Sequence, residues 1–488
     1  MLASGRVLRQ SCCAAALAFI VFTAVSAGES PDDVDHVTKS HDRATRNGDF
    51  PLGIVRGDPV PAFAAGFSHV QEAVQAPGFV SGTPYPAPMP YQHEVRELRY
   101  FSLALAADSL PRARDDIDLF DPALKIHLEN YGRAHVRSRV QSPLDASVQR
   151  WGLDNEWEPP LRMTPAAQSA FAAWLRETYA GDIAALNDAW GTHADAFSAD
   201  LVQVAAADDA WRSHPGAFLD WYAFASEHFL QLLVAQARAM QAADPRARGV
   251  VHKSTQLTLE RPMTSRTRLF DHGRFAELMQ PYGGGFYGID MYGAGDRQAY
   301  ETSYIYNSMR PLDGAAGHGV LLTETNTHGD AARQFASTFW RLLGNGAKGL
   351  MFFTHGNAAA ARASDWNRYA MRDPDTGRYA ARWFYAARLA ATIQRTENFW
   401  AQAVPASVPR VAMLLPQRDV LLAEKSTRNA AEGRFAYARN ERWLVYRWLR
   451  EQGYWVDVLP YARLHQDALR DYDALLLVGA EHLGTEES

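Results

Sequence analysis

Cysteine is nearly absent from this chain of 488 residues. The only two, Cys12 and Cys13, both lie inside the first apolar stretch, "VLRQSCCAAALAFIVFTAVSA". If this stretch is removed, the rest of the chain can form neither a disulfide nor a thiolate metal site. Its stability must then come from the packing of a hydrophobic core.

Clusters of one charge are also scarce. Asp and Glu slightly outnumber Lys and Arg, the formal net charge is −6, and the sequence contains no Lys/Arg block. This balance argues against nucleic acid and against an anionic membrane surface as a partner.

Beyond the N-terminus, no apolar run is long enough to suggest a transmembrane helix. At the N-terminus, Arg6 and Arg9 precede an apolar run that ends in the small residues Val25, Ser26 and Ala27. This pattern predicts a secretory signal peptide over residues 1–27, and hence a secreted or periplasmic protein without membrane attachment after cleavage. A membrane anchor is the weaker alternative, because the run is short for a span of roughly 20 residues and no basic segment follows it. Lipid attachment to a cysteine of this segment is disfavoured, because the usual apolar residues do not precede it.

Alternating strands and helices are present in the middle of the chain. Thr164 and Pro165 are typical of a helix N-cap and first turn, and a second helix is expected over residues 218–243. Apolar strands are expected around residues 249–253, 286–292, 320–324 and 350–354. Because short apolar strands alternate with amphipathic helices, we expect an α/β protein with a (β/α)8 TIM barrel.

Polar residues follow several of these strands. In such barrels the chemistry lies at the C-terminal ends of the strands. The strand-end candidates are Asp154, Asn155, Glu156, His252, Lys253, Asp290, Tyr292, Glu324, Asn326, Thr354 and His355. Two of them, Glu156 and Glu324, are carboxylates at matching places, which is the pair that glycoside hydrolysis requires. The 13 Trp and 20 Tyr suit stacking on sugar rings but are equally ordinary core material.

Four segments carry a family resemblance. The segments "DNEWEPP", "WLRETYAGDIAALNDAWGT", "TETN" and "NGAKGLMFF" resemble glycoside hydrolase family 42, the barrel β-galactosidases of a large retaining clan. The resemblance implies that Glu156 is the acid/base and Glu324 the nucleophile. It also implies that Asn155 binds the sugar 2-hydroxyl and that Tyr292 orients the nucleophile. No cofactor is implied, and we predict no metal, because the cysteine cluster that holds zinc in some relatives is missing.

Further residues of the expected site rest on weaker signals. Trp151 and Trp157 flank Glu156 in sequence and would raise its pKa if they formed a hydrophobic wall beside it. His355 is expected to contact sugar hydroxyls, although a histidine bonded to nearby backbone is an equally good interpretation. Asp365 and Trp366 are candidate substitutes for family sugar ligands that this chain does not match.

The segments on either side of the barrel depart from the family pattern. Residues 28–95 form an atypical N-terminal segment with a Pro-rich loop at residues 81–92, and we place the barrel at residues 96–400. The sequence shows no clear opening strands, so either the barrel begins in an atypical way or its first strands are incomplete. A linker at residues 401–410 leads to a partial Rossmann-like, flavodoxin-like or amidotransferase-like α/β domain at residues 411–488. The resemblance implies a homotrimer through this domain, an expectation weakened because the sequence stops before such a sheet would be complete. A phosphate-binding glycine loop is absent after "VAMLLP", so no nucleotide is expected there.

Two classes of function fit these features. The first is a secreted retaining β-glycosidase, β-galactosidase-like, with carbohydrate as its partner. The second is a catalytically weak carbohydrate-binding relative, and within the enzyme class a hydrolase of the same clan for a different β-linkage is the nearest competitor. Retention of both Glu156 and Glu324 favours the enzyme.

Overall fold

The structure is a computed structural model. It describes residues 52–55, 62, 65, 67–71, 99–103, 118–140, 148–153, 162–207, 209–247, 249–252, 254–255, 272–282, 286–291, 319–326, 332–344, 347–353, 355, 370–373, 376, 378–402, 410–426, 434–460, 464, 469–470 and 472–480.

A nine-stranded parallel sheet forms the centre of the larger unit, in the order β5-β4-β3-β2-β1-β9-β8-β7-β6. Its strands are β1 (Leu52–Val55), β2 (His69–Gln71), β3 (Arg99–Leu103), β4 (Val148–Gly152), β5 (Gly249–Val251), β6 (Ser254–Thr255), β7 (Phe286–Met291), β8 (Gly319–Asn326) and β9 (Ala347–Phe353). The two ends of this order, β5 and β6, are consecutive pieces of chain separated by residues 252–253. They are therefore two halves of one barrel strand, and the sheet closes on itself as a barrel of eight parallel strands. This arrangement confirms the predicted α/β barrel.

The barrel begins earlier than the sequence indicated. β1 pairs in parallel with both β2 and β9, so both opening strands lie before residue 96. The barrel start placed at that residue is therefore too late, and of the two alternatives, an atypical start and missing strands, the pairing of β1 and β2 supports the atypical start. The reason is length: β1 has four residues and β2 three, which is too short for a two-residue alternation to stand out in the sequence.

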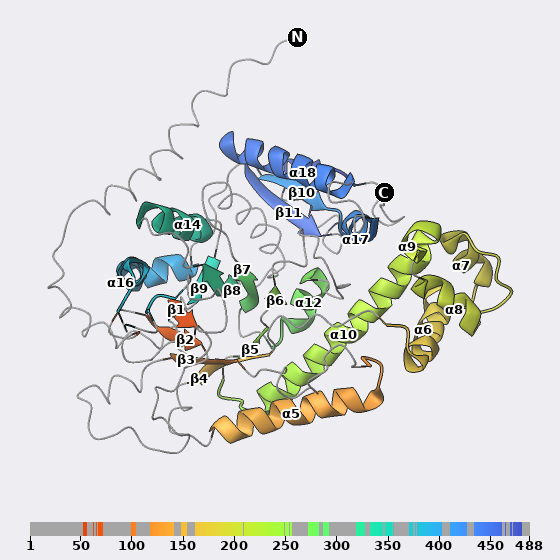
Figure 1. Cartoon of the computed structure of the whole chain (residues 1–488), viewed down its shortest axis with the longest axis horizontal. Helices are drawn as coiled ribbons and strands as arrows, with labels where there is room; N and C mark the ends of the chain where they lie inside the picture. The colour runs from red at the N-terminus through yellow and green to blue at the C-terminus, as the bar shows by residue number, and fades with distance from the viewer. Residues whose placement is uncertain are drawn as a thin grey trace, which may run out of the picture.

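Helices cover the outside of the barrel. Here α5 (Pro122–Val140) and α10 (Pro215–Ala243) lie side by side, and α12 (His272–Met279), α14 (Ala332–Gly344) and α16 (Ala381–Gln402) continue the layer (Figure 1). The helix expected over residues 218–243 begins three residues earlier, at Pro215, because proline suits a first helical turn. One hydrophobic core joins these helices to the strands, with Phe229, Leu233 and Val250 fully buried.

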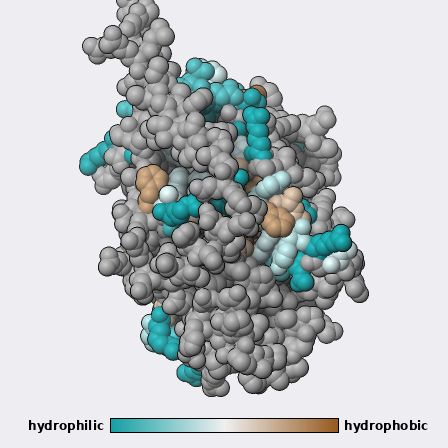
Figure 2. Space-filling view, turned by 90° about the vertical axis from the view of Figure 1, so that its left-hand side faces the viewer, coloured by the Kyte–Doolittle hydropathy of each residue, from teal (hydrophilic) through white to brown (hydrophobic). Residues whose placement is uncertain are grey.

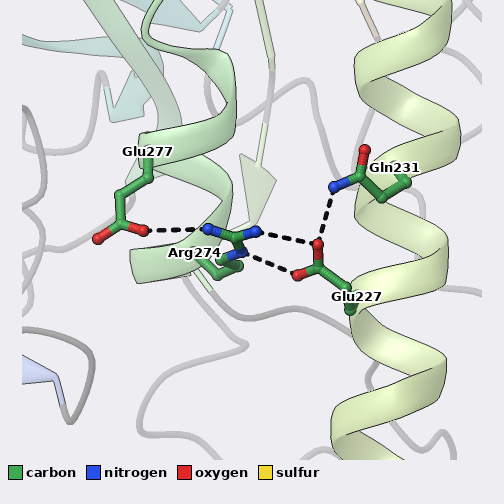
Figure 3. A network of polar contacts seen from close by, with 4 residues as sticks. All are labelled: Glu227, Gln231, Arg274 and Glu277. Carbon is green, nitrogen blue, oxygen red and sulfur yellow. Dashed lines mark hydrogen bonds and ion pairs between the residues drawn. The ribbon is translucent and has the colours of Figure 1, made fainter. Parts of the chain in front are cut away.

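A polar network ties α12 to α10 on the surface (Figure 3). The Arg274 guanidinium donates to both carboxylate oxygens of Glu227, at 2.9 and 3.2 Å, and to Glu277 at 3.4 Å. Gln231 donates to Glu227 at 2.8 Å. Burial alone would raise the pKa of Glu227, but the hydrogen bonds from Arg274 and Gln231 lower it. The network holds α10 and α12 at a fixed distance on the outside of the barrel.

Four short helices form a lobe between β4 and α10. These are α6 (Pro165–Thr178), α7 (Ile183–Trp190), α8 (Ala199–Ala206) and α9 (Ala210–Ser213), and they gather at the N-terminal end of α10 (Figure 1). The predicted cap is confirmed, since the Thr164 hydroxyl accepts from the Ala167 amide at 3.2 Å and Pro165 is the first helical residue. Asp220 of α10 binds this lobe, because its carboxylate accepts from the Tyr179 hydroxyl at 2.6 Å and from the Trp190 indole at 2.8 Å.

The C-terminal unit is a second, smaller α/β layer. Its sheet has the order β11-β10-β12 and is parallel, with β10 (Arg410–Leu415), β11 (Trp455–Pro460) and β12 (Ala474–Leu476). Its helices are α17 (Gln417–Ser426), which the sequence analysis did not identify, and α18 (Arg434–Glu451). Leu422 of α17 packs against Ala210 and Phe218, so this unit rests on the helical lobe.

The outer surface of the described residues is mixed in polarity. On the face drawn in Figure 2, hydrophobic side chains occur in small separate groups next to hydrophilic ones. None of the helices in the described part of the chain is long and apolar enough to cross a membrane.

Candidate active site

Three sequence-predicted residues lie at one end of the barrel. Asp290 is near the end of β7, Glu324 near the end of β8, and His355 two residues after β9. These strands are neighbours in the sheet and run parallel, so their carboxyl ends meet at the same rim. All three side chains are buried, with exposed fractions of 0% for Asp290, 7% for Glu324 and 3% for His355. The structure therefore brings together residues that are 65 positions apart in the chain.

A bulge in β8 coincides with Glu324. On one side Leu322 pairs with Leu350 and Thr325 with Phe352, so two residues of β8 stand opposite Met351 alone. On the other side Leu322 pairs with Ile289 and Glu324 with Asp290. A bulge interrupts the alternation of a strand and re-aims the side chains within it. The two-residue alternation of side chains along β8 is therefore broken at Glu324.

The bulge is held to β7 by a buried hydrogen bond. The Thr323 hydroxyl donates to Asp290 Oδ1 at 2.7 Å, and both residues are fully buried. Two residues before Asp290 in β7, Gly288 lies very close to the chain at the end of β5. A Cβ at Gly288 would collide with the His252 carbonyl oxygen and would lie 2.6 Å from Val251 Cγ1 and 3.0 Å from Thr323 Cγ2. Only glycine fits at this position.

His355 is enclosed by aromatic rings. Its ring centroid lies 5.3 Å from that of Trp383 and 5.8 Å from that of Tyr379, and its backbone carbonyl accepts from the Arg372 amide at 2.7 Å. Burial, and secondly the positive charge of Arg372, lower the pKa of His355 to about 4. The imidazole is therefore neutral near pH 7 and suited to hydrogen bonding rather than to ion pairing.

Two of the predicted site residues, Trp151 and His252, point away from the barrel interior. The Trp151 indole donates to Asp244 Oδ2 at 3.3 Å and its ring meets His135 of α5 edge-on at 6.0 Å, so it faces the helical layer. His252 likewise faces outward, with its ring 4.7 Å from Phe275 of α12. Trp151 therefore belongs to the outer side of the sheet, because successive strand residues face opposite sides. Glu156 lies outside the described residues, so the expected wall beside it stays a prediction.

Other predicted site residues lie outside the described part of the chain. They are Asp154, Asn155, Glu156, Trp157, Lys253, Tyr292, Thr354, Asp365 and Trp366. Their roles stay predictions. Within the described residues, no group of three or more His, Cys, Asp or Glu side chains is placed to hold a metal ion.

The Thr323–Asp290 hydrogen bond and the close approach at Gly288 were not found by sequence reasoning. The sequence does hold a weak signal for the second, because an isolated glycine inside a strand pattern often marks a close backbone approach. No local pattern signals the first, since its partners are 33 residues apart.

The fold and the strand-end carboxylate define a class: a parallel-barrel enzyme with its chemistry at the carboxyl ends of the strands. The sequence model of glycoside hydrolase family 42, described as beta-galactosidase, matches residues 144–396. This match covers just over half of the chain, so the protein belongs to glycoside hydrolase family 42 and is a β-galactosidase-like glycosidase.

Solved structures show the same fold at low identity. The cold-adapted beta-galactosidase from Rahnella sp. R3 superposes with a TM-score of 0.62 at 15% identity, over 89% of this chain and 67% of that one. A catalytic mutant of the family 42 beta-galactosidase from G. stearothermophilus gives 0.61 at 15% identity, over 88% and 67%. The beta-galactosidase from Bacillus circulans sp. alkalophilus gives 0.60 at 15%, over 88% and 67%. This chain thus spans about two thirds of the length of each. No curated protein sequence matches it.

Proposed function

We propose that this protein is a secreted or periplasmic retaining β-glycosidase that hydrolyses terminal β-D-galactosides or galactose-containing oligosaccharides. The observation that carries the proposal is Glu324, a residue only 7% exposed at the bulged carboxyl end of β8 in a family 42 barrel. A carboxylate in this place serves a barrel enzyme as a nucleophile. The solved relatives named above are beta-galactosidases, which supports galactose as the sugar.

The proposed reaction has two displacements. In the first, a Glu324 oxygen forms a bond to the anomeric carbon while the bond from that carbon to the leaving oxygen breaks, and the Glu156 carboxyl gives its proton to the leaving oxygen. In the second, the Glu156 carboxylate takes a proton from water, the water oxygen bonds to the anomeric carbon, and the bond to Glu324 breaks. The product keeps the β configuration, and no cofactor is needed.

Other side chains have supporting roles in the proposal. Asn155 binds the sugar 2-hydroxyl, Tyr292 orients the nucleophile, and neutral His355 accepts from or donates to a sugar hydroxyl. The partner is a carbohydrate, with no role for nucleic acid or for a membrane after loss of residues 1–27. Self-association, as a homotrimer, would involve the C-terminal unit.

The experiment compares wild type with Glu324→Ala and with Glu277→Ala on a panel of chromogenic β-glycosides. Glu277 is a matched control, because it is a carboxylate on the surface of α12 with 42% of its side chain exposed. We expect the β-galactoside to be hydrolysed by wild type and by Glu277→Ala at similar rates. Loss of the nucleophile should lower kcat by at least ~10⁴-fold.

Azide supplies the second half of the test. Because azide is able to attack the anomeric carbon in place of Glu324, the Glu324→Ala variant should yield an α-galactosyl azide, of inverted configuration. A small and equal effect of both substitutions would contradict the assignment. A folded wild type that binds galactose-containing oligosaccharides and turns over nothing would instead favour the binding relative, and preference for another β-glycoside would change the sugar but keep the mechanism.

A further inference from the structure

Thr323, the residue before Glu324, forms a buried side-chain pair with Asp290 of the neighbouring strand. The Thr323 hydroxyl donates to Asp290 Oδ1 at 2.7 Å, and this bond crosses from β8 to β7. Both residues are fully buried, and the backbone of Asp290 is the register partner of Glu324. A hydrogen bond to a carboxylate is stronger than a bond between neutral groups, so the link is a firm one.

The pair faces the interior of the barrel. Tyr287 of β7 lies against Phe275 of the outer helix α12, with ring centroids 6.2 Å apart, so Tyr287 faces outward. Residues of a strand alternate between its two sides, which turns Gly288 and Asp290 inward. A Cβ at Gly288 would also lie 3.0 Å from Thr323 Cγ2, so the Thr323 side chain is on the same side of the sheet as that position. The hydrogen bond therefore lies on the same side of the sheet as the barrel's interior, next to the rim.

The bulge makes this bond matter for Glu324. Thr323 and Glu324 together stand opposite Met351, so the backbone ladder between β8 and β9 is interrupted there. A bulge leaves the extra residue outside the ladder and bends the strand locally, so a side-chain contact at that point helps to fix the position of the segment. The Thr323–Asp290 bond is such a contact, and it is one residue away from the carboxylate.

We infer that Thr323 and Asp290 are positioning residues, which hold the β8 bulge so that the Glu324 carboxylate is aimed at the anomeric carbon. The inference rests on the proposed role of Glu324 as nucleophile. Neither residue touches the substrate in this scheme. Because a displacement of about 1 Å in a reacting group costs roughly 100-fold in rate, loss of the bond should slow the first displacement and leave substrate binding nearly unchanged.

Four variants separate positioning from packing. Thr323→Val keeps the shape and removes the hydroxyl, whereas Thr323→Ser keeps the hydroxyl and removes the methyl group. Asp244→Asn is the control: it perturbs another buried carboxylate, which accepts from Trp151 at 3.3 Å and lies at the end of α10, before β5. Asp290→Asn retains an oxygen acceptor and serves as the second probe if Thr323→Val does not fold.

The readouts are kcat and KM for an aryl β-galactoside, and the rate at which a 2-deoxy-2-fluoro-galactosyl fluoride labels the protein, followed by intact mass. The labelling reports the first displacement alone. For Thr323→Val we expect kcat and the labelling rate to fall by ~10- to 100-fold with KM within ~3-fold of wild type. Thr323→Ser should recover most of the rate. Asp290→Asn should lie between Thr323→Val and wild type, and Asp244→Asn should lose thermal stability but keep kcat.

Several results would overturn the inference. One is a Thr323→Val protein that melts earlier but keeps the wild-type kcat, which would make the pair purely structural. Another is a raised KM with kcat retained, which would mean contact with substrate. A Thr323→Ser variant as slow as Thr323→Val would assign the effect to the methyl group. If wild type itself neither turns over nor becomes labelled, the proposed function fails first, and this inference falls with it.

Discussion

A methyl group added at Gly288 should destabilise the protein more than the same change at Gly132 or Gly344. The new Cβ would collide with the carbonyl oxygen of His252 and would stand 2.6 Å from Val251 Cγ1. The first of these atoms is backbone in the adjoining strand, so it cannot rotate away, and the two strands must separate. Extra methyl groups in packed cores typically cost about 1–3 kcal/mol of unfolding free energy, and we expect Gly288→Ala to cost about 3 kcal/mol.

Two other glycines calibrate this value. A Cβ at Gly132 of α5 would lie 2.8 Å from Met240 Cγ and 3.2 Å from Gln236 Cγ, which are side-chain atoms and can shift more readily than a backbone oxygen. Replacing a helix glycine by alanine gains ~1 kcal/mol, so Gly132→Ala should change the unfolding free energy by less than about 1 kcal/mol. Nothing lies within 4 Å of a Cβ at Gly344, and Gly344→Ala should be neutral or slightly stabilising.

Urea unfolding of the three variants and wild type tests the order. Tryptophan fluorescence and circular dichroism should be recorded together, because coincident transitions are needed before midpoints are converted to free energies. We expect the midpoint to rank Gly344→Ala highest, Gly132→Ala next and Gly288→Ala clearly lowest. A Gly288→Ala midpoint equal to that of Gly344→Ala would refute the closeness of β7 to its neighbour.

Two more predictions concern polar groups. The pKa of His355 lies near 4 instead of its ordinary 6.5, so between these pH values the unfolded chain binds more protons than the folded chain. The free energy of unfolding therefore falls as the pH drops from 6.5 to 4. The loss is on the order of 3 kcal/mol, and His355→Gln should flatten this part of a plot of stability against pH; an unchanged slope would contradict the burial of His355. Tyr179→Phe removes the donor 2.6 Å from Asp220 and should cost about 1–2 kcal/mol of unfolding free energy, against no change for Tyr454→Phe at a 40% exposed position; equal effects would rule out the Asp220 contact.

Local sequence patterns anticipated much of this architecture. Periodicity and capping predicted the helix start at Thr164–Pro165 and the helix α10. They also predicted the strands β5, β7, β8 and β9. Each of these signals is contained in a few neighbouring residues, because capping, helical spacing and strand alternation depend on local backbone geometry. The longer apolar strands β7, β8 and β9 were predicted for this reason, because each has enough residues to show a local pattern.

Elements without a local signal were missed. The three-residue β2 and four-residue β1 carry too few residues to show alternation, and they became visible only through their pairing with each other and with β9. The outward direction of Trp151 was also missed, because its position next to Glu156 in sequence says nothing about which side of the sheet it occupies. Its partner, Asp244, is 93 residues away.

The order of residues alone predicts the alternation of strands and helices, the family segments, and the presence of Glu324 at a strand end. Three features emerge only when the chain folds: the closure of the barrel by β5 and β6, the bulge of β8 at Glu324, and the bond from Thr323 to Asp290. The physical reason is that helix and strand preferences are set by neighbouring residues, whereas strand register and side-chain pairing are set by contacts between segments far apart in the chain.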